Sequence, residues 1–510
     1  MAIVNRVFTE MYDVTAENVP VSCFFVRGTF PLPFLFAAMR HAQISLTRHF
    51  FQIVKEVFPS EPLRVLTNLV QRLFNQRGHQ VTEGVLDNVR LTGGDEALLP
   101  CLCELHNLCW AWCTKFEELV GGDVEIRYLV NEMFNKHLPE YPSRETKVLV
   151  SKCELLLPLP PHDLNELLHW HSSSAPAALV HIDIGPMQEC CRYQQLSPLP
   201  SAIFCDFLCS LLALAVQRST ILRMNRQDRM QRPGFLVSLL ACVTTRLQMH
   251  LASGLAVCTA RLTCKVDTAV QELCNLIEFS VQATQLLNKS IAETLFPELE
   301  TDVHAQNNSK RTLSSYNAEL ESAINKSLDA CLDSIIADLG AALKDQKRMD
   351  YNPKGSQKSN DGSPSAPFAA LVETVRRRVL PLQRSLVGSN KIGVLTSVGA
   401  RLYVLLIQHL KRFVISMGGG LLLLNDMVAV RMLVQEWRIP AVSNLFDRLR
   451  DLVNLFVVSP DALPSMLEAP PFNKMKHGEV MLLVKQRADF DTHVRHVVDW
   501  QSMSEKFSSN

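Results

Sequence analysis

Apolar residues recur every three or four positions over long stretches of this chain. The cleanest stripe comprises Val442, Leu445, Phe446, Leu449, Leu452, Val453 and Phe456. Pro440 stands near its start, where a helix tolerates proline, and Pro460 follows its end. Three further stripes run over residues 63–74, 320–343 and 395–413. This spacing predicts amphipathic helices.

The alternation typical of strands is almost absent from the sequence. Its best run, residues 180–184, is too short to build a sheet. Glycine is also scarce, at 20 of 510 residues, which suits helices better than turn-rich sheets. Amphipathic helices bury their apolar stripes only against one another. We therefore expect an all-α fold, an elongated rod of consecutive antiparallel helical bundles.

Shifts in composition divide the chain. Residues 352–367 lack large apolar side chains and predict a polar flexible linker, and residues 158–200 predict a proline-rich irregular connection. Three helical bundles are expected over residues 50–157, 201–351 and 368–510, with residues 1–49 unassigned.

Glycines mark further helix ends. Gly93–Gly94 and Gly121–Gly122 bracket a further helix, and Gly418, Gly419 and Gly420 predict a break between helices.

Charge and cysteine content indicate the cellular setting. Lys plus Arg equals Asp plus Glu at 51 each, so no global field attracts nucleic acid or anionic lipid. Fifteen cysteines without a disulfide-framework spacing predict free thiols in the reducing cytosol. The longest apolar run, residues 203–216, contains Asp206 and is shorter than the ~20 residues of a membrane span. The sequence predicts no targeting segment and no transmembrane segment.

One local concentration of charge is a candidate contact surface. It comprises five arginines within 15 residues, opposed only by Asp228: Arg218, Arg223, Arg226, Arg229 and Arg232. Their spacing places most of them along one side of a helix, where they would meet an acidic partner or acidic headgroups. The alternative is a solvated polar face that follows the apolar segment before it. Stacking aromatics are not interleaved, so no nucleic acid is predicted as a partner.

A cluster of soft ligands offers a second candidate site, formed by Cys101, Cys103, His106, Cys109 and Cys113. Thiolate and imidazole groups at this spacing would suit zinc. Small cysteines also pack well on buried helical faces, and the two separated C-x-x-C knuckles of structural zinc sites are missing. We favour packing, with no metal, no cofactor and no catalytic residue. His169, His171 and His181 form a further possible ligand set. Phosphate-loop, dinucleotide, zincin and hydrolase motifs are also missing, so no enzyme is predicted.

Several segments, in one order, resemble the exocyst complex component five family of vesicle-tethering subunits. They are residues 51–58, 66–74, 134–141, 350–351 and 455–463, together with Gly419-Gly420-Leu421 and the final Gln486-Arg487-Ala488-Asp489-Phe490. Each is an ordinary helical fragment, and the order carries the resemblance, which covers about residues 50 to 495. The family's N-terminal coiled coil, which joins the core assembly, is expected to be absent from this chain.

The resemblance implies a non-catalytic scaffold within the exocyst, the complex that docks secretory vesicles at the plasma membrane before fusion. It implies other exocyst subunits as partners, notably component six, and through component six a Rab GTPase on the vesicle. It also implies a cytoplasmic protein, peripheral at the plasma membrane and at secretory vesicles through the complex. Two alternatives stay open at this point. One is a recyclin-type trafficking adaptor with the same helical region, and the other is a cysteine- or zinc-dependent helical enzyme.

Overall fold

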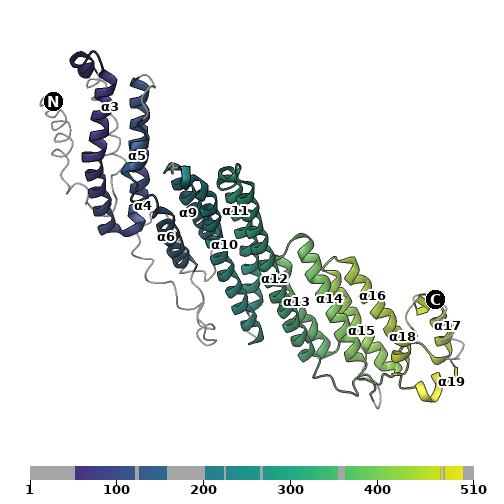
Figure 1. Cartoon of the computed structure of the whole chain (residues 1–510). Coiled ribbons are helices and arrows are strands. Elements are labelled where there is room, and N and C mark those ends of the chain that lie inside the picture. The colour runs from purple at the N-terminus through teal and green to yellow at the C-terminus, as the bar shows by residue number, and fades with distance from the viewer. Residues whose placement is uncertain are drawn as a thin grey trace. The chain divides into compact units, whose positions relative to one another are not determined.

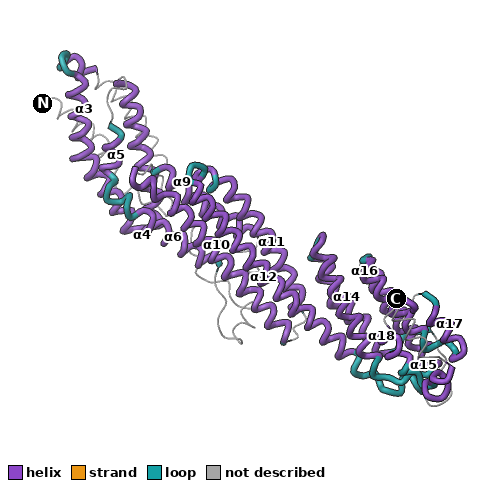
Figure 2. The backbone as a smooth tube through the Cα atoms, turned by 45° about the vertical axis from the view of Figure 1, so that its right-hand side comes forward, coloured by secondary structure: helices purple, strands orange, loops and turns teal. Residues whose placement is uncertain are grey.

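The computed structural model describes residues 52–120, 126–157, 202–222, 226–264, 268–353, 362–470, 472–474 and 477–497. These residues form helices joined by turns, with no strand among them beyond one isolated bridge (Figures 1 and 2). The prediction of an all-α fold built from helical bundles is confirmed. Residues 354–361 of the predicted linker at 352–367 lie outside the described residues, as do the predicted connection at 158–200 and residues 1–49.

The chain divides into two compact units. Unit 1 comprises residues 1–250 and 282–318, and unit 2 comprises residues 251–281 and 319–510. Three long helices contribute residues to both units: α10 (Arg226–Thr263), α11 (Ala269–Thr294) and α12 (Val303–Ala342). The three bundles predicted at residues 50–157, 201–351 and 368–510 do not coincide with these two units. Their boundaries stay a prediction.

The remaining helices belong to a single unit each. Those of unit 1 are α3 (Pro62–Arg72), the π-helical η2 (Leu73–Gly78), α4 (His79–Val120), α5 (Tyr128–Met133), α6 (Tyr141–Leu156), α9 (Ala202–Ile221) and the 3-10 turn η4 (Pro297–Leu299). Those of unit 2 are α13 (Ala366–Ser385), α14 (Gly388–Leu410), α15 (Met417–Gln435), α16 (Pro440–Asn454), α17 (Leu463–Glu468), α18 (His477–Val484) and α19 (Arg495–Val497), with short turns η5 (Pro460–Ala462), η6 (Phe472–Lys474) and η7 (Phe490–Val494).

The apolar stripes read from the sequence are the buried faces of these helices. In α16, which begins at Pro440, the buried residues include Val442, Phe446 and Leu449. This face packs against α15 and α14. The stripe at residues 63–74 covers α3 and the start of η2, and it buries Leu66 and Val70. Burial of such stripes stabilises the fold by about 25 cal/mol per Å² of apolar surface removed from water.

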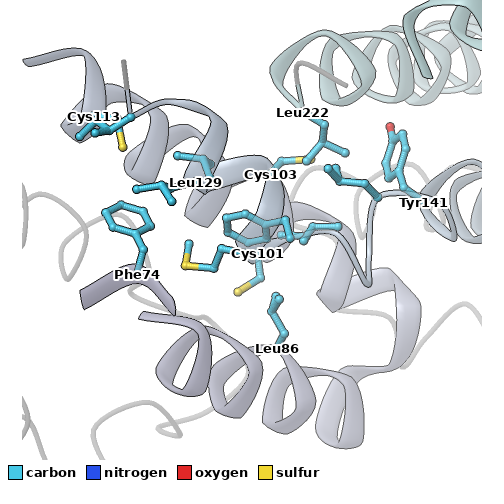
Figure 3. Packing of buried hydrophobic residues seen from close by; sticks show 14 of the residues in the cluster. Phe74, Leu86, Cys101, Cys103, Cys113, Leu129, Tyr141 and Leu222 are labelled. Carbon is cyan, nitrogen blue, oxygen red and sulfur yellow. The ribbon is translucent and has the colours of Figure 1, made fainter. Parts of the chain in front are cut away.

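Unit 1 has a core to which most of its helices contribute. Figure 3 shows part of this core, in which Phe74 and Leu86 lie below the helix that carries Cys101, and Leu222 lies beside Cys103. Helix α4 packs against α6, α9 and α5 around these side chains. The cysteines of α4 therefore act as small apolar side chains of this core.

Length and apolar composition would allow three described helical segments to cross a membrane: residues Gln231–Thr263 of α10, together with α14 and α15. The sequence reading missed them because polar residues interrupt each apolar run. In the structure these helices bury part of their apolar surface. Helix α14 buries Leu395, Val398 and Leu402 among others, and it packs on α13 and α16.

Helix α4 is two helical segments that meet at Gly94. The backbone there has φ 65° and ψ −160°, a conformation that favours glycine because a Cβ atom would clash with the backbone. The second segment, from residue 95 to Val120, is the helix that the sequence placed between two glycine pairs. Gly121 and Gly122 lie outside the described residues.

We expect Gly94→Ala to destabilise unit 1 by about 1–3 kcal/mol, because alanine must adopt a strained backbone conformation. Gly84→Ala is the matched control, since Gly84 lies in the same helix and an added Cβ there meets nothing within 4 Å. The control should be neutral or more stable by about 0.5–1 kcal/mol. Urea unfolding followed by circular dichroism measures both. Equal midpoints for the two variants would contradict the assignment of a strained break at Gly94.

Candidate functional site

Side chains from segments far apart in the sequence meet at one place in unit 2. We call this place the C-terminal junction and define it by Tyr351, Ser365, Gly419, Asp426 and Arg487. Tyr351 follows α12, Ser365 precedes α13, Gly419 and Asp426 belong to α15, and Arg487 follows α18. The junction therefore brings α15 together with the segment that follows α12, the segment that precedes α13 and the segment that follows α18.

Asp426 is the polar centre of the junction and is fully buried. The hydroxyl of Tyr351 donates a hydrogen bond to its Oδ2 atom at 2.6 Å. The backbone N–H of Ser365 donates to its Oδ1 atom at 2.6 Å, and the Ser365 hydroxyl donates to Oδ2 at 3.0 Å. Tyr351 directly precedes the predicted linker, and Ser365 lies near its end, just before α13. One buried carboxylate thus fixes both ends of the segment that connects α12 to α13.

Burial decides the ionisation of this carboxylate. It raises the pKa of Asp426 from 3.8 to about 6, although the hydrogen bonds from Tyr351 and Ser365 act in the opposite direction. Burial beside this carboxylate also raises the pKa of Tyr351 well above its ordinary value, so its phenol stays protonated as a donor. The junction therefore favours the protonated form of Asp426 more than the unfolded chain does.

The glycines at the start of α15 allow two segments to approach closely. A Cβ atom on Gly419 would lie 1.7 Å from the carbonyl oxygen of Tyr351, and one on Gly420 would lie 3.0 Å from the Cβ of Phe456. Ser416 caps α15 by accepting a hydrogen bond from the N–H of Gly419 at 3.2 Å. The break between helices predicted at these glycines is wrong in position, because α15 already begins at Met417. Close approach to Tyr351, and not a helix break, requires glycine here.

Arg487 ties the end of the described chain to the junction. Its side chain is 2% exposed. It donates to the carbonyl oxygens of Leu455 and, at 2.8 Å, Val458, and it pairs with Asp489 at 2.7 Å. The backbone on either side of Arg487 forms the isolated bridge with Ile415, in which the Ile415 N–H donates to Gln486 at 2.8 Å. The C-terminal motif noted in the sequence therefore holds the turn before α15 in place.

The structure places two of the five candidate arginines in ion pairs within unit 1. Arg218 donates from Nε to Glu145 at 2.8 Å, and the Glu145 side chain is 1% exposed. Arg232 pairs with Glu298 at 2.6 Å and bonds to Ser219. Arg218 and Arg232 thus join helices of unit 1 to one another. Arg223 lies outside the described residues, as do the side chains of Arg226 and Arg229. A partner contact by the five arginines stays a prediction.

The cysteine cluster does not converge on a point. Cys101, Cys103, Cys113 and His106 are buried in α4, and Cys113 lies apart from Cys101 and Cys103, at one end of the displayed core (Figure 3). Burial raises the thiol pKa of Cys101 and of Cys103 to about 12. Within the described residues, no three His, Cys, Asp or Glu side chains are arranged to hold a metal ion. The histidines at 169, 171 and 181 lie outside them.

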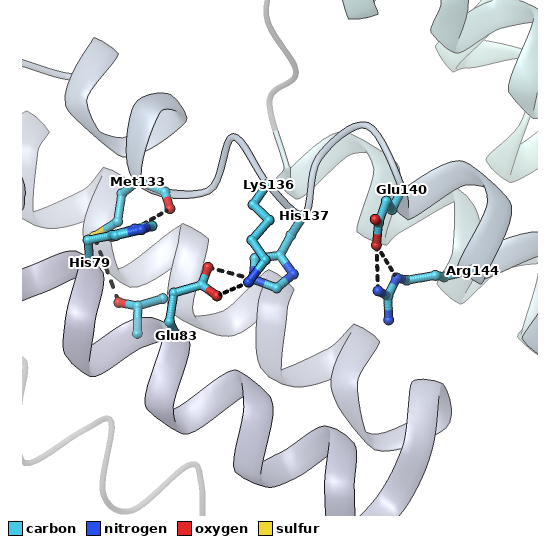
Figure 4. Close-up of polar contacts among 8 residues, drawn as sticks. His79, Glu83, Met133, Lys136, His137, Glu140 and Arg144 are labelled. Carbon is cyan, nitrogen blue, oxygen red and sulfur yellow. Dashed lines mark hydrogen bonds and ion pairs between the residues drawn. The ribbon is translucent and has the colours of Figure 1, made fainter.

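Polar contacts on unit 1 connect α4 with the segment before α6 (Figure 4). Glu83 accepts hydrogen bonds at 2.8 Å from Lys136 and His137. Burial opposes ionisation of Glu83, but these two partners lower its pKa below the ordinary value. Further along, Arg144 of α6 pairs with Asp95 at 2.7 Å. These contacts fix helices in place and show no arrangement for acid–base chemistry.

Comparison with known proteins gives the chain its family. A family model described as exocyst complex component Sec10-like, alpha-helical bundle, matches residues 43–158 and 208–498. The chain belongs to this Sec10-like family. The resemblance read from the sequence is confirmed, and the stretch between the two matched segments overlaps the predicted connection at 158–200. All five residues of the C-terminal junction lie within the second matched segment.

Curated relatives agree with this assignment. The chain is 24% identical over 452 residues to exocyst complex component SEC10b of Arabidopsis thaliana, covering 82% of this chain and 53% of the relative. It is 21% identical over 460 residues to exocyst complex component 5 of Drosophila melanogaster, covering 88% and 62%. It is 27% identical over 234 residues to SEC10 of Saccharomyces cerevisiae, covering 45% and 27%. The chain spans about half the length of the curated relatives it matches.

Sequence reasoning missed two residues of the junction in this Sec10-like chain. Asp426 is a lone acid within the otherwise apolar stretch from Leu421 to Val434, apart from Asn425 and Arg431. A single charge on a helical face that is otherwise buried was the available signal, because such a group needs hydrogen-bond partners. Ser365 carries no such signal, since serine is ordinary in a polar linker.

We expect Gly419→Ala to destabilise unit 2 by about 3 kcal/mol, the upper end of the usual overpacking cost, because its Cβ would overlap the Tyr351 carbonyl. Gly393→Ala in α14 is the matched control, since an added Cβ there meets nothing within 4 Å. The control should be at least as stable as the wild type. Thermal melting of the wild type, Gly419→Ala and Gly393→Ala checks the prediction. Equal melting temperatures for Gly419→Ala and Gly393→Ala would contradict it.

The raised pKa of Asp426 predicts how stability changes with pH. Its stabilising contribution should be fully present below the unfolded-state pKa, near 3.8, and should be lost as the pH rises through about 6. A difference of about two pKa units corresponds to about 3 kcal/mol. Urea unfolding between about pH 4 and about pH 7 should show this loss in the wild type relative to Asp426→Asn.

The exposed Asp461 provides the control for this pH series. Asp461→Asn should keep the pH dependence of the wild type, because Asp461 lies at the surface. A constant stability difference between wild type and Asp426→Asn across the range would show that Asp426 does not titrate with a raised pKa. A difference that grows in the opposite direction would show that the junction favours the charged form.

Proposed function

We propose that this chain acts as a non-catalytic helical scaffold in the exocyst and helps to hold secretory vesicles at the plasma membrane before fusion. The observation that carries the proposal is the match of the Sec10-like helical-bundle family to most of the described helices. The curated relatives are named exocyst complex components. Because the chain spans about half of their length, the whole-complex function is extended to it as a proposal.

The internal contacts of both units support a scaffold role. Buried polar groups are bonded across segments distant in sequence, as Glu145 is to Arg218 in unit 1 and Asp426 is to Tyr351 in unit 2. Removing one partner of a buried pair is costly, so these contacts favour one arrangement of helices within each unit. A scaffold needs such fixed surfaces because its partners recognise side chains on successive helices.

The finer parts of the proposal concern partners and location. We propose that the partners are other exocyst subunits, with component six the first to test, and that component six connects the chain to a Rab GTPase on the vesicle. The chain would be cytoplasmic and would reach the plasma membrane and the vesicle peripherally, through the complex. Co-purification of separately expressed component six with this chain tests the direct contact.

Affinity purification of the tagged chain from cytosol, followed by mass spectrometry, tests the main proposal. We expect several exocyst subunits with the wild type and with Gly393→Ala, and we expect reduced recovery with Gly419→Ala, because unfolding of unit 2 removes its binding surfaces. Absence of exocyst subunits from the wild-type sample, with the chain folded and monodisperse, would contradict the proposal. Equal recovery with an unfolded Gly419→Ala protein would place the contacts outside unit 2.

A further inference from the structure

Two turns of unit 2 each carry two adjacent basic residues followed closely by an exposed apolar residue. After α12, Lys347 and Arg348 are followed by Met349, and after α14, Lys411 and Arg412 are followed two positions on by Val414. All four basic residues are exposed. Met349 is 46% exposed and Val414 is 53% exposed. Each turn thus presents two cations beside an apolar side chain that is open to solvent.

Direct contacts bring these two turns together. Gln346, next to Lys347, bonds to His409 at 2.7 Å, just before Lys411. The backbone N–H of Ser416 donates to the carbonyl of Tyr351 at 2.9 Å. The rings of Tyr351 and Phe413 pack with their centroids 5.2 Å apart. The two turns therefore form one surface at the outer side of the C-terminal junction.

We define the basic end of unit 2 by its cations and by its exposed apolar residues: Lys347, Arg348, Lys411 and Arg412, with Met349, Val414 and Met417. Met417, at the first turn of α15, is 56% exposed. Lys344 adds a further exposed cation, whereas Asp345 and Asp350 are the acids within the same turn. Cations thus outnumber acids here by five to two. Lys347, Arg348, Lys411 and Arg412 form no ion pair with the acidic side chains that the structure describes.

A structural role accounts for only part of this pattern. Basic residues near helix C-termini complement the partial negative charge of the terminal carbonyls, and α12 and α14 both end here. That effect would explain Lys344 and Lys411. It does not explain three apolar side chains left about half exposed among the cations, since exposed apolar surface is unfavourable without a partner.

We propose that the basic end of unit 2 binds an anionic phospholipid surface, with its cations at the headgroups and with Met349, Val414 and Met417 inserted at the boundary of the acyl chains. Charge complementarity favours a lipid surface, because the cations are spread over two turns around the apolar side chains. Amphipathic protein surfaces of this kind bind membranes by combining apolar burial with attraction to anionic headgroups. This contact goes beyond tethering through the complex, and it does not require that the chain assemble with other exocyst subunits.

Vesicle co-sedimentation with the purified full chain tests the proposal. The probes are vesicles of phosphatidylcholine alone and of phosphatidylcholine with phosphatidylserine. The wild type should sediment with the anionic vesicles, not with the neutral ones, and added salt should weaken binding because it screens exposed charges. Each removed cation should weaken partitioning roughly five-fold, so Lys347→Gln/Arg348→Gln/Lys411→Gln/Arg412→Gln together should weaken it by more than about a hundred-fold.

Two further variants make the test specific. Val414→Ser/Met417→Ser keeps all cations and should weaken binding about ten-fold, because the apolar insertion is lost. Arg384→Gln/Lys391→Gln removes two cations at the turn between α13 and α14, about 30 Å away along α13, and should bind as the wild type does. Circular dichroism and melting temperature should be unchanged in all variants, because the altered side chains are exposed or half-exposed.

Three results would overturn the proposal. The first is equal sedimentation with neutral and anionic vesicles, and the second is wild-type binding by the four-cation variant. The third is binding to soluble polyglutamate without binding to anionic vesicles, which would assign the basic end to an acidic protein partner. Exocyst subunits recovered by affinity purification in any of these cases would leave the scaffold function standing while the lipid contact fails.

Discussion

The hydrogen bonds to Asp426 fix the geometry of unit 2. Its carboxylate is fully buried and accepts from Tyr351 and from Ser365, which both lie in the segment between α12 and α13. A buried carboxylate without partners would cost several kcal/mol, so Tyr351 and Ser365 must be in place whenever α15 is packed. Gly419 permits the required approach of the Tyr351 backbone. Helix α15, the linker ends and the turn before α15 are thereby coupled at one point.

Unit 1 is organised by a different kind of contact. Its core is apolar and includes several cysteines of α4, while the buried pair of Glu145 and Arg218 joins α6 to α9. Such a pair adds little net stability over an apolar replacement, yet it strongly disfavours arrangements that separate the two charges. Each unit thus combines a large apolar interface with a few buried polar contacts that select one packing. This combination suits a protein whose surfaces are recognised by fixed partners.

The sequence predicted the helices well because their physics is local. The stripe from Val442 to Phe456 and the proline at its start identify α16 from side-chain spacing alone, and the glycine pair at residues 93 and 94 marks a real helix boundary. The contacts between helices are not local. Arg218 appeared to belong to an exposed basic side, and its pairing with Glu145, 73 residues earlier, has no counterpart in periodicity.

The candidate site could likewise be predicted only in part, because its contacts join segments that are distant in the sequence. Gly419 and Gly420 were recognised as unusual, but the reason lies in the close approach of the Tyr351 carbonyl to Gly419 and of Phe456 to Gly420, which the sequence does not show. Arg487 was noted only as part of a motif, whereas its role depends on the carbonyls of Leu455 and Val458. The family could be identified from the order of several fragments, because order is preserved in the sequence itself. The junction depends on a tertiary arrangement that no single fragment encodes.

The proposed function requires that the chain assemble with other exocyst subunits and not remain an isolated protein. Size-exclusion chromatography of unfractionated cytosol tests this assembly, with the endogenous chain and other exocyst subunits followed in the same fractions. We expect the chain to elute together with those subunits, well ahead of the position of the purified chain. Elution at the position of the isolated chain, with the other subunits in separate fractions, would contradict it.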